Sequence, residues 1–303
     1  MKKRTIVISA IIIVILSAAA INYIFQSLTY KESLKGPALH ENDSNQDDNE
    51  LAGMSNSINI LFLGIDKTEE RENWLGSYRA DTIAIARINL DTQKIKILNI
   101  PRDTYSFIPV ENKKDKINHA YAYGSMQGDG IKASIDAVNN LTNNKIDYYF
   151  AMDMEPVPGI VDEIGGIKLD VEIDMKDHGV NLSKGLQVLN GEQAFDYIRW
   201  RYSPGGDIDR IKRQQKFVST FLKQQRDSGK IIETAELVLK YKDNIQMNLT
   251  FKQLIGFAKF LKEVPEGSVS YLTLPGEGKM IDGISYWVLN EEKTNELFNE
   301  FFK

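Results

Sequence analysis

The chain has 303 residues, a formal net charge of -5 at pH 7 and no cysteine. The lack of cysteine excludes disulfides, thiol catalysis and cysteine-bound metals, and the acidic balance argues against general nucleic-acid binding. A hydrophobic content of 42%, with 13 Tyr and 13 Phe, is typical of a chain that folds around a core.

An uncharged run rich in Ile, Ala and Val spans Thr5–Phe25. It is long enough to cross a hydrocarbon core of about 30 Å, and the basic residues before it place the N-terminus in the cytoplasm and the bulk of the chain outside. We therefore predict that residues 1–4 are cytoplasmic and that 5–25 form a single-pass signal-anchor in the cell membrane. The alternative is a cleaved signal peptide with an A-x-A-like site at Ala18 and Ala20, although the apolar run continues past that site.

Residues 26–57 are predicted to be a disordered extracellular tether. The stretch from His40 to Leu51 is rich in acids and amides and has no apolar periodicity, so it cannot bury enough surface to order itself. Residues 58–303 show no internal repeat and no second break in composition. We expect them to form one folded domain, held near the outer face of the membrane.

The first three predicted strands of this domain carry charged residues at or beside one end. The strands and their charged neighbours are Ile58–Leu63 with Asp66, Ile83–Leu90 with Arg79 and Asp81, and Lys94–Ile100 with Arg102 and Asp103. Strand ends often carry charge for solubility alone, but three consecutive strands with Asp or Arg at an end favour a shared site.

Helical and strand patterns alternate through the rest of the domain. The predicted helices are 130–141, 156–163, 189–199, 207–226, 231–240, 250–262 and 290–302, and the predicted strands are 148–152, 167–171, 269–274 and 284–288. This rhythm predicts an α/β fold, a three-layer α-β-α sandwich around a mixed central sheet, preceded by one N-terminal transmembrane helix.

The segment Arg199–Gln214 concentrates four arginines and a lysine in an acidic protein. Asp207, Arg210 and Gln214 fall within about 60° of one another on a helix, so they share one face. Arginines gathered in this way suit phosphate or pyrophosphate, and a solvated basic helix face is the alternative. Lys212 and Arg213 are rotated away from that row and are predicted to lie on the surface.

The sequence lacks the Gly-rich phosphate loop, the Gly-x-Ser-x-Gly motif and the His-Glu-x-x-His motif. His119 and His178 are predicted to be structural or surface residues, because the histidines are too scattered for a zinc site. Asp66 and Asp81 are candidate ligands of Mg²⁺, which shares substrate phosphates with one or two carboxylates; Mn²⁺ is the other candidate. Carboxylates, arginines and a metal suffice for phosphoryl transfer, which needs little beyond positioning and charge neutralisation.

These residues together resemble the LytR–CpsA–Psr family, and most closely its teichoic acid transferases of the Bacillus type. The resemblance covers roughly residues 58–225 and follows the family's motif order. It is carried by Leu63–Asp66, Arg79–Thr82, Ile100–Asp103, Lys116–Tyr121, Val161–Gly166, Leu189–Gly191, Arg199–Arg201 and Gly206–Gln214.

The resemblance implies that residues 58–303 form a catalytic domain. Its expected reaction moves an anionic glycopolymer, such as wall teichoic acid, from a polyprenyl pyrophosphate carrier to peptidoglycan. The product is a phosphodiester at the 6-hydroxyl of N-acetylmuramic acid, and the prenyl chain lies in an apolar tunnel. The partners implied are the lipid-linked glycopolymer, the peptidoglycan acceptor and the membrane, with no nucleic acid.

The resemblance also implies roles for individual residues. Asp66 and Asp81 would bind Mg²⁺ on the pyrophosphate, and Asp207 would orient the arginines. The phosphate contacts would come from Arg79, Arg102, Arg199, Arg201, Arg210 and Gln214. Asp81 or Asp103 would deprotonate the acceptor, so the expected catalytic set is Asp81, Arg102, Asp103, Arg199 and Arg201.

Two other functions remain open at the level of sequence. A binding module could hold polyprenyl pyrophosphates, or regulate envelope gene expression, without turnover. An exported lipid pyrophosphatase would release phosphate without a sugar acceptor. A transferase differs from the binding module in that loss of Asp66 or Asp81 should stop turnover while much of the lipid binding remains.

Overall fold

The computed structural model describes residues 57–66, 78–153, 155–230, 234, 237, 240–249, 253, 257, 260, 261, 263–265 and 267–303. The predicted anchor at 5–25, most of the predicted tether and the loop 67–77 lie outside these residues, as does most of the predicted helices 231–240 and 250–262. Among the helices that are described, none combines the length and the apolar character needed to cross a membrane.

A six-stranded mixed sheet forms the centre of the domain, in the order β10-β3-β2-β1-β6-β9. β1 is antiparallel to β2 and parallel to β6, and β3 is antiparallel to β2 and parallel to β10. The strands are β1 (Ser57–Asp66), β2 (Arg79–Asn89), β3 (Lys94–Ile100), β6 (Tyr148–Asp153), β9 (Ile245–Met247) and β10 (Val269–Thr273). The predicted α/β fold with a mixed central sheet is confirmed.

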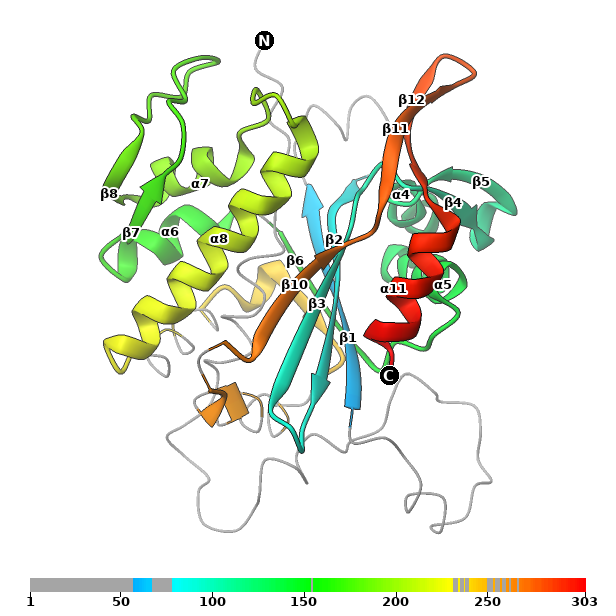
Figure 1. Cartoon of the computed structure of the whole chain (residues 1–303), viewed down its shortest axis with the longest axis horizontal. Helices are drawn as coiled ribbons and strands as arrows, with labels where there is room; N and C mark the ends of the chain where they lie inside the picture. Colours follow the sequence, from blue (N-terminus) through cyan, green and yellow to red (C-terminus); the bar gives the residue numbers. More distant parts are fainter. Residues whose placement is uncertain are drawn as a thin grey trace.

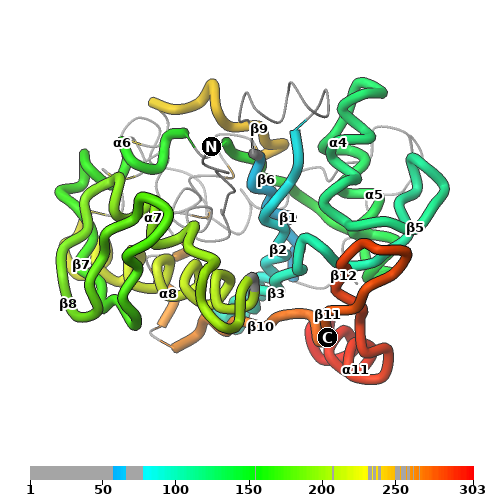
Figure 2. The backbone as a smooth tube through the Cα atoms, turned by 90° about the horizontal axis from the view of Figure 1, so that it is seen from above, coloured from blue at the N-terminus to red at the C-terminus, as the bar shows by residue number. Residues whose placement is uncertain are grey.

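Helices cover both faces of this sheet. Figure 2 shows α6, α7 and α8 on one side of the strands and α4, α5 and α11 on the other. The helices are α4 (His119–Met126), α5 (Gly130–Thr142), α6 (Pro156–Glu163), α7 (Gly191–Arg199), α8 (Gly206–Asp227) and α11 (Glu291–Phe301). Short 3-10 turns span Pro109–Glu111 (η2) and Lys242–Asn244 (η3).

Alternation along β1 builds the two cores. Ile60 and Phe62 pack with α6, α7 and α8, whereas Leu61 and Leu63 pack with α4, α5 and α11. Successive side chains of a strand point to opposite faces, so an apolar run such as Ile60–Leu63 of β1 serves both cores at once.

In the described part of the chain, three two-stranded ribbons flank the layers (Figure 1). They pair β4 (Tyr105–Ile108) with β5 (Lys113–Lys116), β7 (Ile167–Val171) with β8 (Gly185–Leu189), and β11 (Gly276–Ile281) with β12 (Ile284–Leu289). The strands β4, β5, β8, β9 and β11 were not predicted, because these segments are short and several are charged. Helix α4 was also not predicted.

A close approach of α6 and α7 explains Gly191. Its N–H donates to Asp162 Oδ1 at 2.7 Å, and a Cβ on Gly191 would overlap the carbonyl of Pro158, with the carbonyl carbon at 2.6 Å. Gly191→Ala is therefore expected to lower the free energy of unfolding by about 1–3 kcal/mol. Thermal unfolding would measure the loss. Gly278→Ala is the control, since its Cβ would meet nothing within 4 Å; equal melting temperatures for the two variants would contradict the packing argument.

Candidate functional site

The end of β1, the start of β2 and the end of β3 meet at one edge of the sheet, because these neighbouring strands are antiparallel. Asp66 pairs with Arg79 across β1 and β2. The register then shifts between Gly64 and Ile65, which leaves Asp81 as the extra residue of a bulge. Such a bulge can redirect a side chain at a functional site. The predicted metal ligands, Asp66 and Asp81, lie on the neighbouring strands β1 and β2. The side chain of Asp66 is outside the described residues.

Asp81 is held between two donors. Its side chain is fully buried; Arg102 Nη1 donates to Oδ2 at 2.7 Å, and Asn118 Nδ2 donates to Oδ1 at 2.9 Å. The arrangement fixes both a negative oxygen pair and a guanidinium at the sheet edge.

Asp103 forms a second ion pair beside the first. Lys116 Nζ lies 2.9 Å from Asp103 Oδ1, and Arg102 Nε lies 3.6 Å from Asp103 Oδ2. Arg102 therefore lies between two carboxylates, with its side chain 14% exposed. Lys116 and Asn118 were quoted in the sequence motif but were given no role, and the structure places both against predicted site residues.

Helix α8 closes the site from the opposite direction. Arg210 and Gln214 are almost fully buried, and with Ile211 they line a small cavity together with Asp81 and Arg102. Its volume of about 10 Å³ is room for about one water molecule. The remaining lining residues are Thr82, Ile83, Asn99 and Ile100. The strand-end residues and the α8 residues, far apart in sequence, thus form one cluster.

The other predicted residues lie around this cluster. Arg199 is the last residue of α7, and its guanidinium carbon lies 4.6 Å from the centroid of the Phe195 ring. Arg201 is half-buried in the loop before α8, and Arg79 is half-buried at the start of β2. Asp207 lies in the first turn of α8, with its side chain outside the described residues. Which of these side chains contact the substrate stays a prediction.

The prediction that Arg213 lies on the surface is wrong. Its side chain is 2% exposed, and Nη2 donates to the carbonyl of Trp200 and to Ser203 Oγ at 3.2 Å. Burial lowers the pKa of the Arg213 guanidinium, and the nearby Glu172 partly offsets this effect. Lys212, by contrast, is 70% exposed as predicted. Arg213 therefore joins α8 to the loop that carries Arg201.

The donor set at the sheet edge fits a magnesium ion. Within the described part of the chain, no group of three or more His, Asp or Glu residues is placed to enclose a metal. Mg²⁺ does not need such an enclosure, because it is commonly held by one or two carboxylates, waters and substrate phosphates. Asp81 and, on the neighbouring strand, Asp66 supply ligands of that kind.

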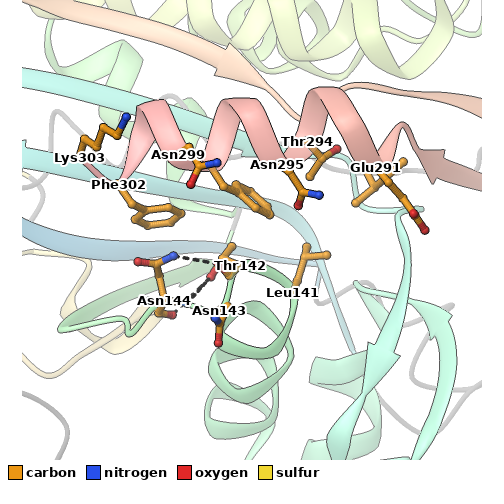
Figure 3. A pocket seen from close by; sticks show the side chains of 12 residues that line it. Leu141, Thr142, Asn143, Asn144, Glu291, Thr294, Asn295, Asn299, Phe302 and Lys303 are labelled. Carbon is orange, nitrogen blue, oxygen red and sulfur yellow. Dashed lines mark hydrogen bonds between the residues drawn. The ribbon is translucent and has the colours of Figure 1, made fainter.

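A larger cavity lies apart from the predicted residues. Figure 3 shows it between the end of α5 and helix α11, with the Phe302 ring and the Leu141 side chain near a set of amides. Its volume is about 770 Å³. The amides are Asn143, Asn144, Asn295 and Asn299. None of the residues predicted to bind phosphate or metal lines it.

Fold and site together define an α/β domain with an edge of arginines and carboxylates suited to a phosphorylated ligand. The pattern described as the LytR_cpsA_psr family matches residues 24–303. The chain belongs to this family.

Named relatives and solved structures agree with that assignment. The polyisoprenyl-teichoic acid–peptidoglycan teichoic acid transferase TagU of Bacillus cereus is 30% identical over 306 residues, which is 99% of this chain and 97% of the relative. A structure described as TagT bound to LIIa-WTA is similar with a TM-score of 0.66 and 26% identity, covering 88% of this chain and 95% of that one. The crystal structure of Bacillus subtilis TagU has a TM-score of 0.57 and 26% identity, covering 81% and 95%.

Proposed function

We propose that this protein transfers an anionic glycopolymer, wall teichoic acid as the first candidate, from a polyprenyl pyrophosphate lipid to peptidoglycan. The bond formed is a phosphodiester at the 6-hydroxyl of N-acetylmuramic acid. The observation that carries the proposal is the convergence of Asp81, Arg102, Arg210 and Gln214 on one cavity. The relatives named as teichoic acid transferases, one of which matches almost the whole chain, support the same reaction.

In this proposal the residues divide the work between the two sides of the site. Arg102, fixed by Asp81 at 2.7 Å, and Arg210 from α8 bind the pyrophosphate oxygens, together with Arg79, Arg199 and Arg201. Asp66 and Asp81 would hold Mg²⁺ or Mn²⁺, which would neutralise charge on the pyrophosphate. Fixed cations in a buried site stabilise developing charge better than water does, because they need no reorganisation.

An apolar groove further along α8 is our candidate for part of the prenyl chain. It lies between α8 and β10, has a volume of about 280 Å³, and includes Leu222, Val264 and Tyr271 in its lining. A helix rises about 1.5 Å per residue, so Leu222 lies roughly 18 Å along α8 from Arg210. Helix α8 thus extends from the residues proposed to bind the pyrophosphate to the groove proposed to hold part of the prenyl chain.

The membrane anchor and the location belong to the same proposal. Residues 5–25 cross the membrane once, with 1–4 in the cytoplasm, 26–57 as tether and 58–303 outside. This arrangement is supported by the apolar run and its basic flank, and it brings the catalytic domain to both a membrane lipid and the wall.

Chelation provides the test. We expect the full-length protein, in detergent with lipid-linked teichoic acid and peptidoglycan oligomers, to form a covalent conjugate that EDTA reduces to background and added Mg²⁺ or Mn²⁺ restores. Donor binding is measured in parallel by partition of labelled lipid. Conjugate formation that EDTA does not reduce would refute the assignment of a metal to this site. Tight donor binding without conjugate would identify a binding module, and phosphate release without acceptor would identify a pyrophosphatase.

A further inference from the structure

His119 is a partly buried histidine, and only one of its ring nitrogens has a hydrogen-bond partner among the described residues. Its Nδ1 lies 2.9 Å from Asp115 Oδ2, and its ring meets Tyr123 edge-on with centroids 6.0 Å apart. Nε2 is buried and makes no hydrogen bond with any described residue. A histidine kept only for structure normally has its buried nitrogens satisfied, so the prediction of a structural or surface role leaves Nε2 unexplained.

Asp115 is fixed as a carboxylate. Tyr123 donates its hydroxyl to Oδ2 at 2.6 Å, and the backbone N–H of Lys116 donates to Oδ1 at 2.7 Å. Burial raises the pKa of Asp115, but the hydrogen bonds from His119, Tyr123 and Lys116 outweigh it, so this pKa lies below its usual value. A carboxylate only accepts, so Nδ1 of His119 carries the proton and Nε2 of the neutral ring presents a lone pair.

The surroundings keep the His119 ring neutral. Burial lowers its pKa below the ordinary 6.5; the hydrogen bond to Asp115 acts the other way, and the positive charges of Arg79 and Lys116 lower it further. Tyr286 from β12 reaches the same cluster, donating to Asp115 Oδ1 at 3.4 Å. At neutral pH the ring is therefore free to take up a proton, and it loses that capacity as the pH falls through its lowered pKa.

The pair of His119 and Asp115 adjoins the phosphate site on the face opposite α8. Asn118, the residue before His119, donates to Asp81, and Lys116 pairs with Asp103. Figure 2 shows α4 and α8 on opposite sides of the sheet. In phosphoryl transfer the attacking and leaving oxygens are roughly in line, so a nucleophile activated from α4 approaches opposite the cations of α8.

We propose that His119, oriented by Asp115, is the catalytic base for the acceptor hydroxyl, an inference that rests on the proposed transferase function. Nε2 takes the hydroxyl proton while the acceptor oxygen bonds to the polymer-bearing phosphorus. The bridging P–O bond breaks, and polyprenyl phosphate leaves with the electron pair. The carboxylates predicted for this role are less suited, because both oxygens of Asp81 accept hydrogen bonds, from Arg102 and Asn118, and Asp103 is paired with Lys116.

The test is the pH dependence of transfer by the full-length protein with Mg²⁺. We expect His119→Asn to lower kcat about 10²–10⁴-fold with little change in KM for the donor, and to abolish the acid limb of the pH–rate profile. Asp115→Asn should lower kcat and move that limb to lower pH, since it removes the group that raises the His119 pKa. His178→Asn, which changes a half-exposed histidine stacked on Tyr202, is the control and should keep the wild-type limb.

The outcomes separate this inference from the function on which it rests. If the wild-type protein forms no conjugate, the proposed transferase function is contradicted. Wild-type transfer combined with a His119→Asn variant that keeps its rate or its acid limb would overturn the role of His119 alone. If His119→Asn does not fold, as judged by circular dichroism, an unshifted limb in Asp115→Asn would overturn it equally.

Discussion

Asp81→Asn is expected to lower glycopolymer transfer by about 10²–10³-fold while donor binding falls much less. The asparagine amide keeps the shape of the carboxylate but removes its charge, and it turns an NH₂ group toward one of two donors, Arg102 Nη1 or Asn118 Nδ2. The substitution should also lower the affinity of the site for Mg²⁺, because a neutral amide is a poorer ligand for Mg²⁺ than a carboxylate.

The same substitution has a cost in stability that must be measured separately. Loss of one partner from a buried ion pair costs about 3–5 kcal/mol; Arg102 is slightly exposed and keeps Asp103 at 3.6 Å, so we expect the lower end of that range. Denaturant unfolding gives this number. Asp136→Asn is the control, since its pair with Lys132 lies on the exposed face of α5 and is worth little. Wild-type transfer rates in folded Asp81→Asn would show that this carboxylate has no part in turnover.

Hydrophobic patterning predicted the elements that make up the layers. The bounds of β3, α6 and β7 match the predicted ranges, because apolar alternation, an initial proline and a Gly-Gly turn define them locally. The ribbon of β4 and β5 was missed since Lys113–Lys116 has no apolar alternation. Its two strands pair with each other across the η2 turn but have only four residues each, so they are too short for a hydrophobic pattern to reveal them.

The sequence grouped the candidate site residues by type but did not reveal their contacts, and their roles stay a prediction. Sequence indicated that strand-end carboxylates and the arginines near α8 would share one site, and Asp81, Arg102 and Arg210 do line one cavity. The bulge at Asp81 and the bond from Asn118 follow from strand register and from the approach of α4, neither of which is encoded in motif spacing. The contact of His119 with Asp115 was not predicted for the same reason, because Asp115 lies on a strand that was not predicted.

Arg213 shows how a helical projection fails when a loop covers a polar face. Position 213 is rotated away from the row of Arg210 and Gln214, so the pattern indicated solvent. The loop between α7 and α8 folds back over it, and the guanidinium binds the carbonyl of Trp200 and the hydroxyl of Ser203. The conformation of the segment that carries Arg201 thus depends on a residue that has no predicted contact with substrate.

Arg213→Met is therefore expected to destabilise the fold and to weaken donor binding indirectly. Methionine fills much of the same volume, but the carbonyl of Trp200 loses a charged donor; the free energy of unfolding should fall by roughly 2 kcal/mol. Glu172 adds little to this loss because its side chain is 37% exposed and its nearest oxygen is 3.7 Å from Arg213 Nη1. Denaturant unfolding and partition of labelled polyprenyl pyrophosphate would measure the two effects.

The neighbouring position supplies the control. Lys212→Met removes a cation of the same sign from the next residue of α8, but its side chain is 70% exposed and its partner Asp209 is 3.5 Å away, so stability should change by less than about 0.5 kcal/mol. A loss of net charge lowers affinity for an anionic lipid equally in both variants, whereas displacement of the loop affects only Arg213→Met. Donor affinity about tenfold weaker in Arg213→Met than in Lys212→Met would correspond to about 1.4 kcal/mol of positioning by the buried guanidinium. Equal affinities would show that Arg201 keeps its place without it.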